Sequence, residues 1–311
     1  EDNKQSANKR HPSFTMTTPV QNALLPQLRK ILRQGGSMLL LLLLIALFWE
    51  GTKWIGGDPW RAEGNPWGLV HNPPLRWKVA SDLNLPHIWQ IVDAFGNPSR
   101  RNGPALGAVL IGAAIFTFRE SIVGFLFGAL LGLLLGTLFV HFRLLERGCM
   151  PYVVASQTVP ILAIAPMVII WLKAGWISVA VIAAYLTFFP VTINTLRGLR
   201  SPAPEAIELM HSYAASPWAI LWKVRFPAAL PYIFTALKIS ATASVVGSII
   251  GELPSGIRDG LGGAILNFNQ YYISGPERLW ATIVVSAAVG ITFYLLILLC
   301  EQFSLRSRRI R

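Results

Sequence analysis

Residues 201–239 hold the polar side chains best suited to binding another protein. This stretch lies between two apolar runs and carries two Ser-Pro pairs, at 201–202 and 216–217. A serine followed by proline is typical of a helix start, because the serine oxygen accepts a backbone N–H and proline leaves none unpaired. Glu205 and Glu208 would lie early in the first helix, where the helix dipole favours negative charge. The sequence therefore predicts two short capped helices.

The chemistry predicted for these two helices is the docking of a partner protein. Anchoring of their tryptophans at a membrane surface is the alternative, but anchoring alone would not require two helices. Pro227 and Pro231 are expected to end the second helix, because proline lacks the N–H that an interior turn needs.

Reactive side chains form no catalytic pattern in the sequence. There is no G-x-x-x-x-G-K-[ST] loop for a nucleotide phosphate, no H-E-x-x-H and no G-x-S-x-G. Cys149, Cys300 and the five histidines lack the spacing of metal ligands, and the histidines are expected to be scattered over the surface. We therefore predict no enzyme, metal or cofactor site in this chain, and energy would have to enter through a partner.

The composition is that of a membrane protein. Of the 311 residues, 53% are hydrophobic and 14% are charged, and the mean hydropathy is +0.50. A helix needs about 20 apolar residues to cross the hydrocarbon core. We predict an all-α, polytopic fold with about six transmembrane helices, at 36–54, 121–140, 151–172, 176–193, 231–251 and 279–300.

The net charge of +12 is distributed unevenly along the chain. Segments predicted to face the cytoplasm hold 16 Lys and Arg against 6 acids, and those predicted outside hold 10 against 9. Excess basic charge on one side is the positive-inside pattern, not the footprint of a nucleic-acid partner. Both termini and the docking stretch are therefore expected inside. The predicted cytoplasmic segments are 1–36, 141–150, 194–230 and 301–311.

The chain divides into two tails, an N-terminal membrane segment and a core. Residues 1–30 are predicted to be a disordered tail, in which Met16 is a candidate natural start, and 301–311 form a basic tail. Residues 31–104 hold the first span and an outer loop whose tryptophans are expected at the membrane surface. The transmembrane core is 105–300.

The core is expected to open with a short helix that leads into the second span. Residues 105–118 are apolar but too short to cross a membrane, and Arg119 and Glu120 follow them. We expect these two charged residues to face the outside. Lys238, near the start of the fifth span, is expected to reach the inner headgroups.

Glycines recur every four residues in the second span. Glycine costs up to about 1 kcal/mol against alanine in a helix, so a glycine face needs a compensating contact. Close approach to another helix supplies one, either as static packing or as a sliding surface. The residues are Gly124, Gly128, Gly132 and Gly136.

The third and fifth spans hold candidates for a polar pathway. Pro151, Pro160 and Pro166 predict a bent or broken third span, and irregular backbone in a membrane is buried or lines water. The second half of the fifth span is rich in small and hydroxyl residues. Ordinary helix packing is the alternative for both regions. The candidate pathway residues are Ser156, Gln157, Thr158, Pro160, Ser244 and Ser248.

Residues 208–227 resemble the cytoplasmic "EAA" loop of permease subunits from bacterial ABC importers. That pattern is E-A-A, three residues, Gly, nine residues and I-x-L-P. Here Glu208 stands at its first position, Ala214 at the glycine and Pro227 at the final proline, so the spacing is kept while most letters differ. The following PAALPYIFTALKIS is similar to permeases for nitrate, sulfonates, taurine, bicarbonate and pyrimidine-type compounds. The resemblance covers about 105–300.

This resemblance implies the partners. The permease would work in a bacterial inner membrane as a pair, and two identical copies are the default in this family. Its partners would be two ATPase subunits that bind ATP and Mg, and a solute-binding protein. In this family the docking residues for the ATPase would be Glu205, Glu208, Met210, His211, Tyr213, Ala214, Ser216, Trp218, Trp222 and Pro227.

The segment GELPSGIRDGLGG also resembles the family, whose members place an acidic residue and then Gly-Leu-Gly after the fifth span. Glu252, Gly260 and Gly262 match and would form an outer gate. The ELPSG variant is similar to permeases for riboflavin-like or hydroxymethylpyrimidine-like heterocycles. A self-contained secondary transporter or channel is the alternative function, against which the sparse charge within the spans argues.

Overall fold

The computed structural model describes residues 21–61, 66–100, 102–173 and 175–306, without the side chains of 21–35, 38, 39 and 306. The predicted tails at 1–20 and 307–311 lie outside this part. The described residues form helices, turns and loops, and among them there is no strand but only two isolated bridges, Trp60–His71 and Pro98–Ala105. The all-α prediction is confirmed.

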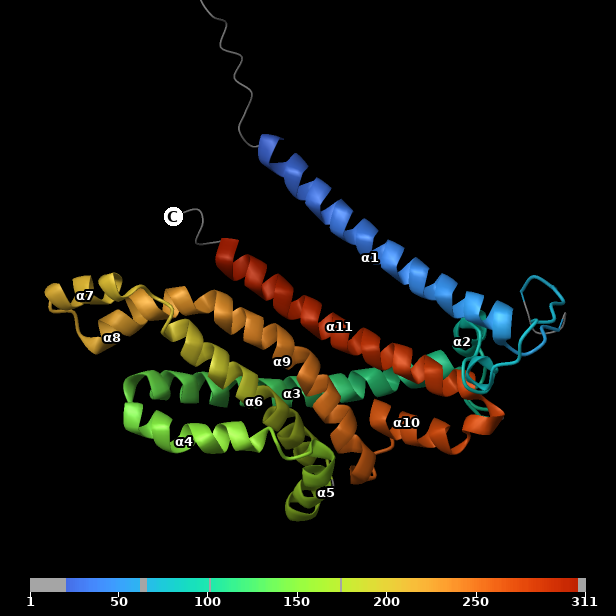
Figure 1. The fold of residues 1–311 in the computed structure, drawn as a ribbon. Coiled ribbons are helices and arrows are strands. Elements are labelled where there is room, and N and C mark those ends of the chain that lie inside the picture. Colours follow the sequence, from blue (N-terminus) through green and yellow to red (C-terminus); the bar gives the residue numbers. More distant parts are fainter. Residues whose placement is uncertain (1–20, 62–65, 101, 174, 307–311) are drawn as a thin grey trace, which may run out of the picture.

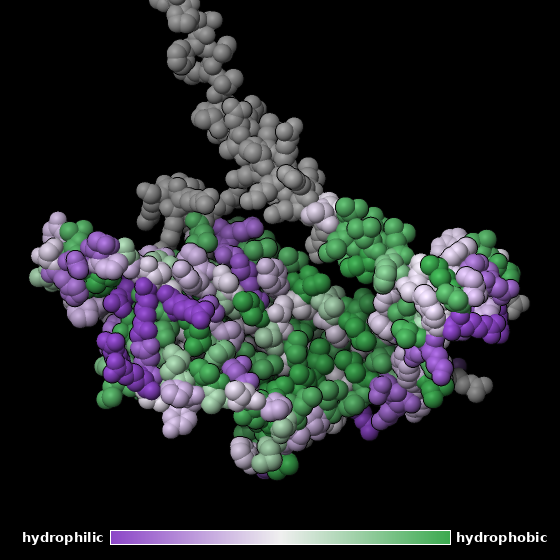
Figure 2. Space-filling view, in the orientation of Figure 1, coloured by the Kyte–Doolittle hydropathy of each residue, from purple (hydrophilic) through white to green (hydrophobic). Residues whose placement is uncertain are grey.

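Long apolar helices connect two polar ends of the molecule (Figure 1). Among the described residues, four helical segments are long and apolar enough to cross a membrane, or five if one bent pair counts as a span. Figure 2 shows hydrophobic residues over the middle and hydrophilic residues at both ends. The chain is thus a multi-pass membrane protein, and the count of six remains a prediction. The spans are α3 (Leu106–His141), α6 (Trp176–Leu199), α8 (Pro217–Ile220) running into α9 (Phe226–Ser255), and α11 (Pro276–Arg306).

Helix α1 (Gln21–Gly56) stands apart from the core over most of its length (Figure 1). It begins ten residues before the predicted boundary, so 21–30 are helical rather than disordered; this segment is rich in the helix formers Leu, Gln and Ala. Its far end is attached, because Trp49 packs edge-on against Trp280 of α11, with ring centroids 4.9 Å apart.

The four predicted packing glycines lie on the face of α3 that contacts α6. A Cβ at Gly128 would lie 2.5 Å from the backbone oxygen of Ala184, closer than real atoms approach. A Cβ at Gly124, Gly132 or Gly136 would also come too close to atoms of α6. The predicted close approach is confirmed, and it is tight packing in this structure.

Helix α3 runs unbroken through Arg119 and Glu120, as expected for a short helix that leads into the second span. The expectation that Glu120 faces the outside is wrong, because its side chain is only 3% exposed. Glu120 lies on the same face of α3 as Ser121 and Gly124, and that face packs inward. Helix α6 continues through Pro190 to Leu199, because packing between α3 and α9 offsets the one missing N–H.

The predicted break of the third span is confirmed. Helices α4 (Arg143–Ser156) and α5 (Ile161–Leu172) meet at 101° across the four residues that end at Pro160. Helix α4 begins eight residues before the predicted start of this span.

Short elements gather at the two polar ends. Helices α7 (Pro204–Ser212) and α8 lie at one end, and the C-terminal end of α11 points toward it (Figure 1). At the opposite end lie α2 (Ile88–Ala94), α10 (Leu261–Gln270) and the 3₁₀ turns Lys78–Ala80 and Tyr272–Ser274.

Candidate functional site

The predicted docking stretch forms an exposed surface at one end of the molecule. We call residues 204–226 the docking surface; it comprises α7, α8 and the π-helical turn Leu221–Arg225. Glu205, Glu208 and His211 are exposed, and Met210 is half-buried. The large aromatic residues are exposed as well, with Tyr213 at 77%, Trp218 at 65% and Trp222 at 50%.

Only one of the two predicted serine caps is present. Ser216 caps α8, its Oγ accepting the N–H of Ala219 at 3.2 Å. The prediction for Ser201 is wrong: α7 begins at Pro204, and the Ser201 hydroxyl donates to the backbone oxygen of Gly198 at 2.8 Å. The reason is that α6 extends to residue 199, so Ser201 belongs to its C-terminal turn.

The second helix does not end at Pro227, contrary to the prediction. The π-helical turn joins α8 directly to α9, with Pro227 in the first turn of α9 and Pro231 in the next. Proline is compatible with a first turn, where its N–H would have no partner. A continuous helical segment of 39 residues, Pro217–Ser255, therefore runs from the docking surface through the apolar core.

Ala214 has a backbone conformation that favours glycine. Its φ is +50°, in the left-handed region, at the turn between α7 and α8. Glycine stands at this position in the pattern that the sequence resembles, and only glycine adopts such a φ without steric cost.

The three predicted outer-gate residues come together at the far end of α9. The Glu252 side chain is fully buried, and its Oε2 accepts the N–H of Gly262 at 2.5 Å. Its Oε1 accepts the hydroxyl of Thr117 at 2.6 Å, and that hydroxyl oxygen accepts the N–H of Leu261 at 2.8 Å. One carboxylate therefore links α9, α3 and the start of α10.

Gly260 must be glycine for this arrangement to exist. A Cβ there would lie 2.3 Å from the carboxyl carbon of Glu252. A cavity of about 1270 Å³ opens nearby, between the first turns of α3, residues 256–259 and α10; it is lined in part by Arg258 and Asn267.

The sequence of this chain is similar to those of known transport proteins. The sequence profile of the family described as "binding-protein-dependent transport system inner membrane component" matches residues 128–305, more than half of the chain. The chain belongs to this family. The family predicted from residues 208–227 is thus confirmed, and permeases of this kind are not themselves enzymes.

Three relatives show how far the similarity extends. The permease is 34% identical over 166 residues to the riboflavin transport system permease protein RibX of Chloroflexus aurantiacus, covering 53% of this chain and 61% of the relative. It is 30% identical over 219 residues to a probable ABC transporter permease protein of Haemophilus influenzae, covering 67% and 87%. It is 34% identical over 140 residues to the formylaminopyrimidine transport permease protein ThiX of Halalkalibacterium halodurans, covering 45% and 56%. The chain thus spans less than two thirds of the riboflavin and formylaminopyrimidine relatives.

The predicted pathway residues of the permease fall into two environments. Gln157, Thr158 and Pro160 are exposed at the break between α4 and α5, where Tyr185 of α6 donates its hydroxyl to the backbone oxygen of Ser156. Ser244 and Ser248 are fully buried in α9, and Ser248 accepts the hydroxyl of Ser121 at 3.0 Å. The two serines thus occupy a packed helix interface, and a pathway role remains a prediction.

Three charged contacts were not predicted from the sequence. The Nζ of Lys238 lies 2.7 Å from Oε2 of Glu301, and both side chains are less than one-fifth exposed; its place at the inner headgroups stays a prediction. Glu146 forms a two-pronged ion pair with Arg200. Glu120 is buried beside Glu252, and neither of its carboxyl oxygens has a hydrogen-bond partner among the described residues.

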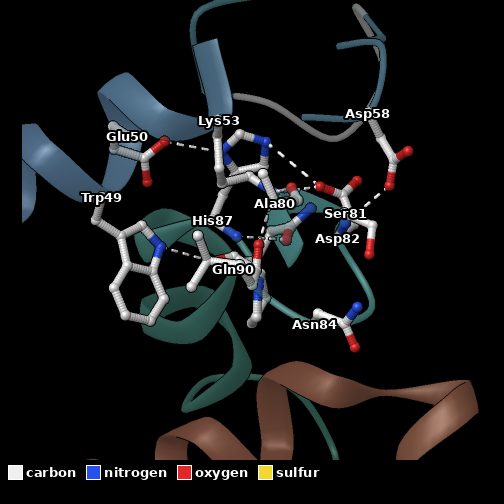
Figure 3. Close-up of polar contacts among 12 residues, drawn as sticks. Trp49, Glu50, Lys53, Asp58, Ala80, Ser81, Asp82, Asn84, His87 and Gln90 are labelled. Atoms are coloured by element: carbon white, nitrogen blue, oxygen red, sulfur yellow. Dashed lines mark hydrogen bonds and ion pairs between the residues drawn. The ribbon is translucent and has the colours of Figure 1, made fainter. Parts of the chain in front are cut away.

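The segment that follows α1, which was predicted to lie outside, folds into a module attached to α1 by a polar cluster (Figure 3). Lys53 of α1 is fully buried, with its Nζ 2.5 Å from Oδ1 of Asp82 and 2.6 Å from the backbone oxygen of Leu85. Glu50, one turn earlier, contacts Nδ1 of His87 at 2.8 Å. A charged pair three residues apart at the end of an apolar helix was the sequence signal for this cluster.

Aromatic residues pack around this module, and two expectations for them are wrong. His87 is 4% exposed and stacks on Trp89, so it is not a scattered surface histidine. Trp60, at 8% exposed, is packed inside rather than placed at a membrane surface, whereas Trp67 and Trp77 remain exposed.

Proposed function

We propose that this permease is the membrane-spanning subunit of an ATP-driven importer that carries a small solute delivered by a binding protein. The observation that carries the proposal is the docking surface. Its acidic and aromatic side chains are exposed, yet its second helix continues without a break into α9. A partner bound there has a direct mechanical connection to the membrane core.

The proposed assembly contains a second, identical permease, two ATPase subunits that bind ATP and Mg, and a solute-binding protein on the opposite face. Six spans with both termini inside a bacterial inner membrane complete it. The excess of basic residues in the predicted cytoplasmic segments supports this orientation. The position of the C-terminal end of α11 on the side of α7 supports it too (Figure 1).

In the proposed mechanism, ATPase closure pushes on the docking surface and α9 moves as a rigid body. Glu252 lies at the other end of the same helix and holds the start of α10 through Gly262. Movement of α9 would therefore shift α10 and open or close the cavity beside it. Rigid elements with two arrangements are the physical means of such coupling.

We propose a heterocyclic solute of the riboflavin or pyrimidine type rather than nitrate, bicarbonate or a sulfonate. Two relatives at 34% identity carry riboflavin and formylaminopyrimidine in their names. A relative from Bacillus subtilis named for aliphatic sulfonates is 30% identical. Uptake of labelled riboflavin and of labelled taurine by cells with the complete system separates the two classes.

Charge reversal on the docking surface tests the proposed coupling. Glu208→Lys is expected to leave membrane insertion unchanged and to reduce ATP-driven uptake at least about ten-fold, because a complementary contact becomes repulsive. Uptake and ATP hydrolysis are measured together in proteoliposomes that contain the ATPase and are supplied with the solute-loaded binding protein. Asp93→Lys, an equal charge change on an exposed residue at the opposite end, is the control. Normal coupled uptake by Glu208→Lys would contradict docking at this surface.

The alternative, a self-contained ion-coupled transporter, has one observation in its favour. Glu120 and Glu252 are acidic residues buried in membrane helices, where ionisable groups often serve transport. We expect the purified chain alone, in liposomes under a proton or sodium gradient, to give no solute flux above that of empty liposomes. Gradient-driven flux without ATPase subunits would support the alternative.

A further inference from the structure

A basic cavity lies beside α4. The start of α4 lies at the end of the molecule that carries α7 and α8 (Figure 1). The cavity has a volume of about 830 Å³, and it is bounded by the last turn of α3, one face of α4 and Arg200 after α6. It is separate from the outer-gate cavity and from the docking surface residues.

The lining of this cavity changes character along α4. Arg143 and Arg147, one helical turn apart, form the wall at the polar end. Met150, Pro151 and Val154 continue the same helix face toward the apolar middle of the molecule. A ligand that fills the cavity would therefore need an anionic head and an apolar tail.

The positive charge of this wall is not neutralised within the described chain. The Glu146 carboxylate is engaged by both terminal nitrogens of Arg200, at 2.8 and 2.5 Å. Arg143 and Arg147 make no hydrogen bond or ion pair with any described residue, and they act on Glu146 only through space. Two exposed guanidinium groups are therefore available to a ligand.

The position of these arginines on α4 adds to the positive potential. Arg143 is the first residue of α4, and Arg147 follows in the next turn. The N-terminal end of a helix carries partial positive charge, and the one acid in this turn, Glu146, already forms hydrogen bonds with Arg200. A phosphate group would accept hydrogen bonds from both arginines and offset this positive potential.

We propose that this cavity binds an anionic phospholipid of the adjacent leaflet, with the phosphate at Arg143 and Arg147 and an acyl chain along Met150 and Val154. Basic pockets between transmembrane helices are suited to anionic headgroups. The site lies where the polypeptide passes from the membrane to the docking surface. The proposal goes beyond the transport function and does not depend on it.

Native mass spectrometry of the purified full-length permease tests this proposal. The protein is supplied with phosphatidylglycerol or with phosphatidylcholine of identical acyl chains. We expect about ten-fold higher retention of phosphatidylglycerol than of phosphatidylcholine. Both lipids offer a phosphate to the arginines, but only phosphatidylglycerol carries a net negative charge. Arg143→Gln combined with Arg147→Gln is expected to lower phosphatidylglycerol retention about ten-fold.

The control removes the same amount of charge elsewhere at this end. Arg197→Gln combined with Lys223→Gln, two exposed positions outside the cavity, is expected to change retention less than about two-fold. Thermal unfolding midpoints of both double variants show whether each is folded. If the arginine pair variant is unfolded, Val154→Trp, which fills the apolar part of the cavity, replaces it and is expected to lower retention.

Three results would overturn the proposal. They are equal retention of the two lipids, an equal loss of phosphatidylglycerol in the control variant, and displacement of the lipid by excess inorganic phosphate. The last result would identify a site for free phosphate instead of a lipid.

Discussion

A permease with valine at Gly128 is expected to unfold roughly 6–12 °C below the unmodified protein, on the basis of about 3 kcal/mol for forced overpacking. A Cβ at this position would lie 2.5 Å from the backbone oxygen of Ala184 and 2.6 Å from Cβ of Thr187. The neighbours are backbone and a β-branched side chain, neither of which can swing away. The two helices would have to separate along the whole seam.

The matching control is Gly290→Val in α11, where a Cβ would meet nothing within 4 Å. Both variants add the same side chain to a membrane helix, so the difference between their unfolding midpoints isolates the helix contact. The midpoints are measured in detergent by loss of helical circular dichroism. Equal midpoints for the two variants would show that α3 and α6 are not packed as described.

Replacing Glu252 with alanine is expected to release α10 and abolish transport. The carboxylate accepts hydrogen bonds from Thr117 and from the Gly262 N–H. A hydrogen bond to a charged group contributes about 1.5–3 kcal/mol, so the start of α10 would lose about this amount with its Gly262 contact. Amide hydrogen exchange over residues 261–270 should accelerate roughly 10- to 150-fold, as local opening becomes easier.

Two further variants test separately the charge of the Glu252 side chain and the hydroxyl of Thr117. Glu252→Gln keeps one acceptor oxygen but turns an NH₂ group toward the other donor, so an intermediate exchange rate is expected. Thr117→Ser keeps the hydroxyl that joins Glu252 to Leu261, and its exchange rate should stay near that of the unmodified permease. Unchanged protection of α10 in Glu252→Ala would disprove the linking role of the carboxylate.

One helical segment, Pro217–Ser255, joins the two ends of the permease to which we assign functions. The docking surface is at the start of this segment, and the outer-gate carboxylate is near its end. Helix α6 packs both against this segment and against the glycine face of α3. Force applied at Trp218 or Trp222 would then reach Gly262 without passing through a flexible loop.

Patterns with a strong local cause could be read from the sequence. The glycine spacing predicted the α3–α6 contact, and the prolines of the third span predicted its break; the break falls at Pro160, while Pro151 and Pro166 lie inside α4 and α5. The Ser216 cap also has a local cause, because the serine oxygen and the N–H that it binds are three residues apart. The matched spacing from Glu208 to Pro227 led to the family itself.

Local signals failed where neighbouring helices decide the outcome. Ser201 and Pro227 were predicted as helix boundaries, but α6 extends past its proline and α8 continues into α9. Glu120 was placed outside because charge disfavours the membrane, whereas the register of α3 turns it inward beside Glu252. The positions of such residues depend on which helices surround them.

The sequence by itself determined the class of the protein, its apolar helices and the residues that form the docking surface. Apolar run length, charge bias and motif spacing are properties of neighbouring residues along the chain, and they need no knowledge of the fold. The tertiary structure alone decided that Glu252 links three helices, that Lys238 pairs with Glu301, and that Lys53 is buried against Asp82. The Lys53–Asp82, Lys238–Glu301 and Thr117–Glu252 contacts join residues 29–135 positions apart, and a buried charge is stable only where the fold brings such a partner to it.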